Sequence, residues 1–303
     1  MKQEIIKKFS RNVSTNIKLS KYNWFNVGGP AELFFKPENK NQLIEFLKYI
    51  KENKFKITVL GAGSNTLIRD EGIKGVVIKL SPNFSKIELI NKDTIQVGAA
   101  TLDRKISNFA KENCIGNLAF LSCIPGSIGG AVIMNSGCYG YDMSKVLSSI
   151  NVIDVQDCIE KQINREDIDF FYRGTNLPSG LIITSVKLKG TVADKQLIEK
   201  KQLQMLEQKK LSQPSQVKTC GSTFKNLNNE KKAWQLIKET GCDKFFEGDA
   251  VISEKHCNFF VNNGNAKSSD IEKLINKVKK TVNDKTGINL ELEIKIIGEK
   301  KKI

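Results

Sequence analysis

The sequence predicts a mixed α+β fold rather than a regular alternation of strands and helices. Strand-like segments dominate the chain up to about residue 190, and helical patterns dominate after it. Two glycine-rich turns, at residues 61–65 and 126–130, interrupt the strand-rich part. A chain of 303 residues is long enough for two or three domains of about 100–150 residues each.

The first part of the chain predicts one clear amphipathic helix at residues 39–54. Asn39 is a suitable N-cap, and apolar residues recur on one face from Leu43 to Ile50. A second helix is expected at residues 102–113. Strands are expected at 56–60, 75–80, 94–100, 149–155 and 180–190.

After residue 190 the pattern changes to three helices, expected at residues 192–211, 231–240 and 269–286. In the last of these, Ser269 and Glu272 have the spacing of a capping box, and Gly287 ends the helix. A final strand is expected at 290–298. Strict alternation there would place Glu291 and Glu293 on the same face.

Composition excludes several classes of protein. The net charge of +15 raises the possibility of nucleic-acid binding, but only five of the 48 basic residues are Arg and the excess is spread along the chain. No apolar run has the length of a signal peptide or membrane span, so a cytoplasmic protein is expected. The seven cysteines have no CxxC spacing, which argues against a disulfide framework or metal site.

The glycine motifs indicate a ligand with phosphates. Gly61 and Gly63 follow a strand, yet Thr66 and Ser81 stand where a Rossmann fingerprint needs its third glycine and its acidic residue. No P-loop sequence is present either. Tight turns can still offer backbone N–H groups to an anion. Both motifs are also compatible with purely structural turns, but together they fit a long ligand such as a flavin dinucleotide.

Seven motifs along the chain carry a resemblance to a known family. The motifs are NVGGPAELF (26–34), LGAGSNTLI (60–68), IPGSIGGAVIMNSGCYG (124–140), FYRG (171–174), CGSTFKN (220–226), SEKHCNFFVN (253–262) and LELEIKIIGE (290–299). With these motifs in this order over nearly its whole length, the sequence resembles the UDP-N-acetylenolpyruvoylglucosamine reductase (MurB) family. The stretch after Arg173 resembles the family's compact form, which lacks an extra substrate-covering loop.

The resemblance implies a two-subdomain FAD-binding fold of the vanillyl-alcohol-oxidase (PCMH) type plus a C-terminal α+β substrate-binding domain. The expected boundaries are 1–82 and 83–190 for the FAD subdomains and 191–303 for the substrate domain. It further implies non-covalent FAD, NADPH as co-substrate and no metal. The implied FAD contacts are Gly61, Ala62, Gly63, Ser64, Asn65, Ile124, Pro125, Gly126, Ser127, Gly129 and Gly130.

The implied reaction reduces the enolpyruvyl ether of a UDP-sugar to a lactyl ether. This chemistry needs a cation at the carboxylate, a proton donor and a polar orienting group. By resemblance, Arg173, Ser222 and Glu293 take these roles. The expected substrate contacts are Tyr139, Tyr172, Lys210, Lys225 and Asn226. No nucleic acid or membrane partner is expected, and the oligomeric state is left open with a monomer as the expectation.

The chain departs from the family pattern at a few positions. Asn26 and Lys295 replace usual arginines, Leu227 replaces a proline, and residues 174–177 differ after Arg173. His256, the only histidine, lies in a family motif, but no catalytic role is expected for it. Two alternative functions remain: a different FAD oxidoreductase, such as an alcohol or sugar oxidase, and a basic nucleic-acid-binding protein.

Overall fold

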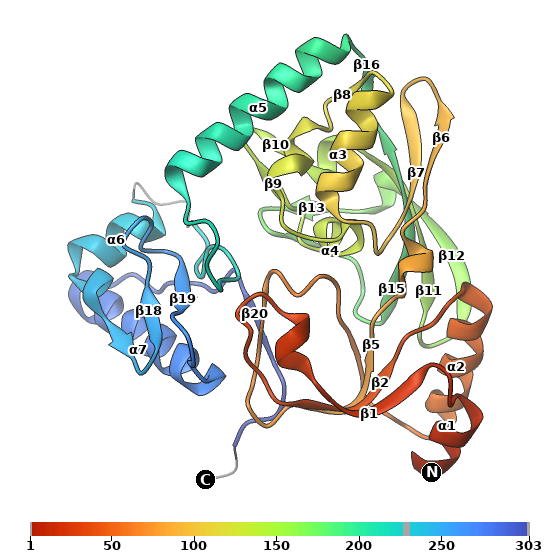
Figure 1. Ribbon diagram of the computed structural model, residues 1–303, viewed down its shortest axis with the longest axis horizontal. Helices are drawn as coiled ribbons and strands as arrows, with labels where there is room; N and C mark the ends of the chain where they lie inside the picture. The colour runs from red at the N-terminus through yellow and green to blue at the C-terminus, as the bar shows by residue number, and fades with distance from the viewer. Residues whose placement is uncertain (1, 227–230, 302–303) are drawn as a thin grey trace. The chain divides into compact units, whose positions relative to one another are not determined.

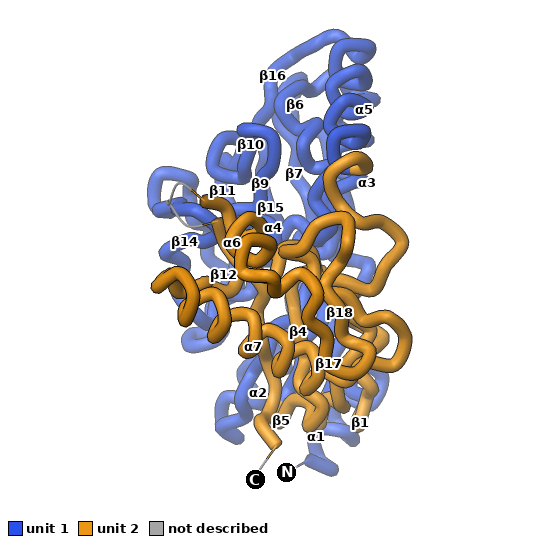
Figure 2. The backbone as a smooth tube through the Cα atoms, turned by 90° about the vertical axis from the view of Figure 1, so that its left-hand side faces the viewer, with its two compact units in different colours: residues 1–14, 34–62, 76–209 blue, residues 15–33, 63–75, 210–303 orange. Residues whose placement is uncertain are grey.

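The computed structural model describes residues 2–226 and 231–301, which form two compact units. Figure 2 shows the two units in different colours. Unit 1 comprises residues 1–14, 34–62 and 76–209, and unit 2 comprises residues 15–33, 63–75 and 210–303. Each unit is therefore built from separated stretches of the chain.

The helices and strands match most of the expected segments (Figure 1). The helices are α1 (Lys2–Lys8), α2 (Lys40–Glu52), α3 (Asp103–Glu112), α4 (Ile128–Ile133), α5 (Lys195–Ser212), α6 (Ala233–Glu239) and α7 (Ser268–Thr286). The strands are β1 (Val13–Lys18), β2 (Pro30–Phe35), β3 (Ile57–Val59), β4 (Thr66–Ile68), β5 (Ile73–Ile78), β6 (Ile87–Asn91), β7 (Thr94–Gly98), β8 (Ile115–Gly116), β9 (Gly137–Cys138), β10 (Tyr141–Asp142), β11 (Leu147–Asp154), β12 (Ile159–Asn164), β13 (Phe170–Phe171), β14 (Gly174–Thr175), β15 (Leu181–Lys189), β16 (Thr191–Val192), β17 (Phe246–Glu247), β18 (Ala250–Ile252), β19 (Phe260–Asn262) and β20 (Lys295–Ile297).

A five-stranded antiparallel sheet with the order β12-β11-β15-β7-β6 forms the centre of unit 1. Ile150 in β11 lies opposite Val186 in β15, which in turn lies opposite Val97 in β7. Figure 1 shows α3 and α4 on one side of this sheet. Their apolar side chains, including Ile106 and Val132, pack with those strand residues in one core. The segment 124–133 thus packs against one face of this sheet.

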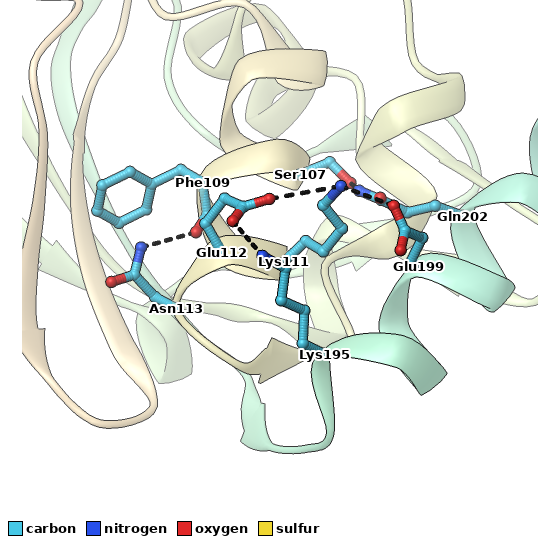
Figure 3. Close-up of polar contacts among 8 residues, drawn as sticks. All are labelled: Ser107, Phe109, Lys111, Glu112, Asn113, Lys195, Glu199 and Gln202. Atoms are coloured by element: carbon cyan, nitrogen blue, oxygen red, sulfur yellow. Dashed lines mark hydrogen bonds and ion pairs between the residues drawn. The ribbon is translucent and has the colours of Figure 1, made fainter.

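The long helix α5 is held to α3 by both buried and exposed polar contacts (Figure 3). The amide of Gln202 donates a 2.6 Å hydrogen bond to Ser107 Oγ, and both side chains are buried. At the surface, Lys111 Nζ lies 3.1 Å from Glu199 Oε1 and 3.5 Å from Glu112 Oε1. The buried bond contributes more to holding α5 than the exposed ion pairs, which solvent screens.

The α2 prediction is confirmed, including its N-cap. Asn39 Oδ1 accepts a 2.9 Å hydrogen bond from Gln42 N. The buried face of α2 carries Phe46, whose ring stacks on Phe35 with a centroid distance of 3.7 Å. Strand β3 then pairs in parallel with residues 76–78 of β5. These contacts fix the strand that leads into residues 61–62.

In unit 2, the three-stranded sheet β17-β18-β19 packs with α6 and α7 around an apolar core. Strand β20 pairs in parallel with β4, with Lys295 opposite Thr66. The predicted final strand at 290–298 is therefore too long, because a bend at residues 293–294 precedes β20. Glu291 is exposed and Glu293 half-buried, so the expected shared face is also wrong.

The predicted capping box of α7 is wrong by two residues. Lys267 is the N-cap, and Asp270 Oδ2 accepts a 2.9 Å hydrogen bond from its backbone N–H. Asp70 caps the same helix by accepting from the backbone of Ser268 and Ser269. Glu272 instead makes a two-point ion pair with Arg69. The helix ends at Gly287 as predicted, with a φ of 71°.

Candidate active site

The second glycine motif is fixed onto the end of β7 in unit 1. Ile128 N donates to Thr101 O at 2.9 Å, Gly129 N donates to Ala99 O at 3.0 Å, and Asp103 N donates to Gly126 O at 3.1 Å. Residues 128–133 form helix α4, which the sequence patterns did not predict. Ile124, Pro125 and Gly126 are half-buried and precede this helix. The motif is therefore a turn leading into a short helix, rather than an isolated tight turn.

The two glycine motifs meet within unit 1 around Ser127. A Cβ atom built at Gly61 would lie 3.0 Å from Ser127 Oγ, and one built at Gly130 would lie 3.9 Å from it. Gly61 and Gly130 are both exposed, which leaves their backbone open to a ligand. Gly129 has a different reason for lacking a side chain, because its Cβ would come 3.1 Å from Ala99 Cβ.

A lysine adds positive charge beside the first motif. Lys79 Nζ donates a 2.5 Å hydrogen bond to Gly61 O, while Ala62 is half-buried next to it. Burial, and then the charge of Lys36, lower the pKa of Lys79. An anionic group bound at the turn would favour the charged form of this lysine.

Arg173 lies at the tip of a hairpin between β13 and β14. Its φ is 59°, a left-handed conformation that non-glycine residues rarely adopt. Its Nη1 donates a 3.2 Å hydrogen bond to Gly137 O, and its guanidinium lies 5.1 Å from the ring centre of Tyr172. The side chain is half-buried, and Tyr172 is exposed. Strained backbone of this kind is often found at functional positions.

Tyr139 lies in a second hairpin, between β9 and β10, which the Arg173 side chain contacts. Tyr139 and Gly140 have φ values of 53° and 81°, the pattern of a two-residue type I′ turn. Asn135 supports the Arg173 hairpin, because its amide donates to Phe171 O at 3.1 Å. Unit 1 thus brings Arg173 into contact with Tyr172 and with the hairpin that carries Tyr139.

In unit 2, the remainder of the first glycine motif has mainly structural partners. Gly63 has a φ of 69°, and a Cβ there would lie 2.0 Å from Tyr22 O. Close backbone packing therefore requires this glycine. Ser64 and Asn65 are half-buried. Asn65 Nδ2 donates a 3.1 Å hydrogen bond to Glu293 O, and Asn65 O accepts from Lys295 N at 2.9 Å.

Ser222 and Glu293 come from neighbouring segments of unit 2. Glu293 N donates a 2.9 Å hydrogen bond to Thr223 O, directly after Ser222. Ser222 and Glu293 are each half-buried. Asn258 holds the other side of the segment, because its Oδ1 accepts from Phe224 N at 3.0 Å and its amide donates to Phe224 O at 2.8 Å. The structure thus brings two of the three expected catalytic residues close in the fold, and Arg173 belongs to unit 1.

The expected substrate contacts of unit 2 also have structural partners. Lys225 Nζ lies 3.5 Å from Glu291 Oε2, and Asn226 Oδ1 accepts from Ala233 N at 3.2 Å. Lys210 O accepts a 2.6 Å hydrogen bond from Lys255 Nζ. His256 Nδ1 accepts from Asn258 N at 3.3 Å, and burial lowers the pKa of this imidazole. The neutral imidazole of His256 therefore accepts the hydrogen bond that helps to hold Asn258 in place.

Comparisons with known proteins decide the family. Residues 213–297 match the model of the UDP-N-acetylenolpyruvoylglucosamine reductase C-terminal domain, and residues 31–158 match an FAD binding domain. The UDP-N-acetylenolpyruvoylglucosamine reductase of Pelagibacter ubique is 48% identical over 98% of this chain and 100% of that protein. The chain belongs to the UDP-N-acetylenolpyruvoylglucosamine reductase family, MurB.

Other MurB proteins are similar over most of the chain. The reductase of Orientia tsutsugamushi (strain Ikeda) is 43% identical over 94% of both chains. The crystal structure of the MurB protein from Thermus caldophilus superposes with a TM-score of 0.81 at 32% identity, covering 94% of this chain and 97% of that one. These matches confirm the predicted fold class and the predicted FAD oxidoreductase of peptidoglycan precursor synthesis.

The residues of unit 1 fit the FAD cofactor that the MurB family implies. Gly61 and Gly130 expose backbone without side chains beside Ser127, as close approach of a ligand requires. Thr101 and Asp103 carry buried polar atoms without a hydrogen-bond partner in the described residues. They flank Leu102, which pairs with Ser127 as a β-bridge. A polar ligand is thus compatible with this wall of the unit.

Some departures from the MurB pattern have local explanations. Gly174 is buried, and a Cβ there would lie 2.2 Å from the Phe171 ring, so a larger residue would displace it. Asn26 has a φ of 60°, a conformation that asparagine tolerates better than most residues. Leu227 lies outside the described residues.

Sequence reasoning missed two residues that support the site. Asn258 holds the Ser222 segment, and Lys79 donates to the first glycine turn. Asn258 lies within a family motif, so its type and place were visible. Lys79 carried no signal, because it is one of many lysines and only the fold places it beside Gly61.

Proposed function

We propose that this chain reduces UDP-N-acetyl-3-O-(1-carboxyvinyl)-glucosamine to UDP-N-acetylmuramate in the cytoplasm, with NADPH as the reductant. Membership of the MurB family supports this proposal. Gly61–Asn65 and Ile124–Gly130 would hold FAD. When bound, FAD supplies a carrier that accepts hydride from NADPH and passes it to the substrate. We further propose that residues 1–82 and 83–190 bind the flavin, that residues 191–303 bind the substrate, and that the enzyme is a monomer.

Arg173 binds the substrate carboxylate in this proposal. Hydride addition to the terminal vinyl carbon leaves negative charge on the neighbouring carbon and its carboxylate. A guanidinium stays charged and can bind a carboxylate with two hydrogen bonds. Two hydrogen bonds hold the hairpin that carries Arg173: Arg173 Nη1 at its tip donates to Gly137 O, and Asn135 Nδ2 donates to Phe171 O in β13. Such support limits the reorganisation needed as charge develops.

Ser222 donates the proton and Glu293 orients or stabilises the proton-transfer site. The observation that carries this assignment is the 2.9 Å hydrogen bond from Glu293 N to Thr223 O. This bond ties together two positions that are far apart in the sequence and that were selected independently by family motifs. A serine hydroxyl is a weak acid, so it requires nearby positive charge to transfer its proton.

The remaining polar residues bind the UDP-sugar. Lys210, Lys225 and Asn226 are proposed to contact the diphosphate, because ammonium and amide groups donate hydrogen bonds to phosphate oxygens. Tyr139 and Tyr172 are proposed to contact the sugar or the carboxyvinyl group of the substrate. Both side chains are exposed. Tyr139 itself has a positive φ, and Tyr172 directly precedes Arg173, which also has one.

The test is Ser222→Ala in the flavin-loaded protein, with the two half-reactions measured separately by stopped-flow absorbance. NADPH-driven bleaching of the flavin should be unchanged, and reoxidation by the enolpyruvyl substrate should slow by about 10²–10⁴-fold. Ser215→Ala, at an exposed position of the same unit, is the matched control and should leave both rates unchanged. Equal slowing of both half-reactions by Ser222→Ala would remove this residue from the proton-donor role.

A further inference from the structure

An exposed tryptophan of unit 2 has no role in the proposed reaction. Trp234 lies in helix α6 and is 40% exposed. Ala233, Leu236 and Ile237 of the same helix are buried in the core of unit 2, so Trp234 is on the outward face. A single exposed apolar residue is ordinary on a protein surface. The surroundings of Trp234 therefore decide whether its ring has a function.

The backbone of Trp234 is fixed beside a residue that is proposed to bind the diphosphate. Asn226 Oδ1 accepts a 3.2 Å hydrogen bond from the backbone N–H of Ala233, the residue before Trp234. The thiol of Cys257 donates a 3.0 Å hydrogen bond to the backbone carbonyl oxygen of Trp234. The indole is thus carried on a backbone that is held next to Asn226.

A row of aromatic rings connects Trp234 with the proposed proton donor. Ser222 pairs with Phe259 as an antiparallel β-bridge. The ring centre of Phe259 lies 4.9 Å from that of His256, which lies 6.5 Å from that of Trp234. The rings meet at angles of 65° and 62°, the edge-to-face arrangement that aromatic pairs favour. Trp234 is the end of this row away from Ser222.

The order of these residues matches the order of the groups in a UDP-sugar. The carboxyvinyl group is proposed to react at Ser222, and the diphosphate is proposed to bind at Asn226 and Lys210. The uridine is the next group after the diphosphate. Trp234, one residue from the partner of Asn226, is therefore placed to meet the base. Aromatic side chains bind bases by stacking, because every base has a flat π-face.

We propose that Trp234 forms a nucleobase subsite, in which the uracil ring of the substrate stacks on the exposed part of the indole. This inference rests on the proposed function, since only a substrate with a uridine diphosphate would use the subsite. The ring of His256 packs against the indole and limits its movement. Trp234 contacts no reacting atom, so its contribution is to substrate binding.

The experiment measures the Kd of UDP and of inorganic pyrophosphate for the flavin-loaded full chain by isothermal titration calorimetry. Trp234→Ala should raise the Kd of UDP about 5–100-fold, the range expected for the loss of one base stack. It should leave the Kd of pyrophosphate unchanged, because this probe has no base. Trp234→Phe keeps a π-face and should recover most of the affinity. Phe246→Ala, at a position of unit 2 that is 64% exposed, is the matched control and should change neither constant.

Kinetics and fluorescence test the same contact independently. Trp234→Ala should raise the KM for the enolpyruvyl substrate by a similar factor, and flavin reoxidation at saturating substrate should keep its rate. The chain has two tryptophans, so Trp24→Phe leaves Trp234 as the only one. UDP should quench the emission of that variant.

The possible results separate this inference from the proposed function. An equal Kd of UDP for the parent and Trp234→Ala would overturn the nucleobase subsite and leave the proposed function standing. An equal rise in the Kd of pyrophosphate would also overturn it, because the loss would not depend on the base. A parent protein that binds no UDP would contradict the proposed function and the subsite together.

Discussion

Asn65 Nδ2 donates a 3.1 Å hydrogen bond to the backbone carbonyl oxygen of Glu293, across 228 residues of sequence. The bond links the first glycine motif to the segment that carries a proposed catalytic residue. A second hydrogen bond, from Lys295 N to Asn65 O at 2.9 Å, joins the same two segments through the backbone of Asn65. Within unit 2, the position of Glu293 therefore depends on Asn65.

Replacing Asn65 should weaken both the fold and the second half-reaction. Asn65→Ala removes the donor to Glu293 O and should lower the free energy of unfolding by about 1 kcal/mol. Displacement of Glu293 should slow flavin reoxidation by the substrate about 10–100-fold. Asn65→Asp should be worse than Asn65→Ala, because it places a carboxylate against a carbonyl oxygen. Urea unfolding and stopped-flow absorbance measure the two effects, and equal behaviour of both variants would contradict this role.

Arg173→Lys should separate charge from geometry. A lysine keeps the positive charge but loses the planar fork that binds a carboxylate at two points. We expect flavin reoxidation by the enolpyruvyl substrate to slow about 10²–10³-fold while reduction by NADPH is unchanged. Arg104→Lys, at an exposed position of the same unit, is the control. If Arg173→Lys and Arg104→Lys reoxidise at the same rate, Arg173 does not bind the carboxylate.

The Arg69–Glu272 ion pair should contribute measurably to stability. Its two hydrogen bonds are each 2.9 Å long, and its side chains are only 20% and 24% exposed. Glu272→Gln should therefore lower the free energy of unfolding by about 1–3 kcal/mol. The control Asp284→Asn removes an ion pair that is 77% and 53% exposed and should cost less than about 0.5 kcal/mol. Equal losses in urea unfolding would show that burial does not set the strength of these pairs.

Asp103 should make stability depend on pH in an unusual direction. Its carboxyl group is buried without a partner in the described residues, and burial raises its pKa well above 3.8. The unfolded chain releases this proton near 3.8, so the contribution of Asp103 to stability is complete below that pH and is lost as the pH rises toward the folded pKa. Asp103→Asn should thus stabilise the protein at pH 7, by an amount that shrinks toward pH 4.

The measurement for Asp103 is the thermal midpoint as a function of pH, compared with Asp167→Asn at an exposed position. The difference between the Asp103→Asn variant and the parent should grow from pH 4 to pH 7, and the control should show no such trend. A constant difference across that range would mean that the carboxyl group is not neutral in the folded protein.

Local patterns predicted the elements of the fold well. Asn39 caps α2 and Gly287 ends α7 as the sequence suggests, because these signals act within a few residues. The start of α7 was misplaced because its second capping residue, Asp70, comes from a distant segment. The bend at residues 293–294 also has a distant cause, since Asn65 and Thr223 hold Glu293 there.

The candidate site was predicted from family motifs rather than from physical patterns. Ser222 and Glu293 carry no local sign of catalysis, and contacts such as the bond from Glu293 N to Thr223 O show that their segments are neighbours. The contact of Lys79 with Gly61 was not predictable, because it depends on a tertiary contact between segments with unrelated local patterns.

The most direct test of the proposed reaction is an absorption spectrum between about 300 and 550 nm, recorded anaerobically. The flavin bands of the purified protein should bleach after NADPH is added and return after the enolpyruvyl substrate is added, with UDP-N-acetylmuramate as the product. Bands that return only when oxygen is admitted would contradict the reductase and indicate an oxidase, and a protein without flavin bands after FAD supplementation would contradict both.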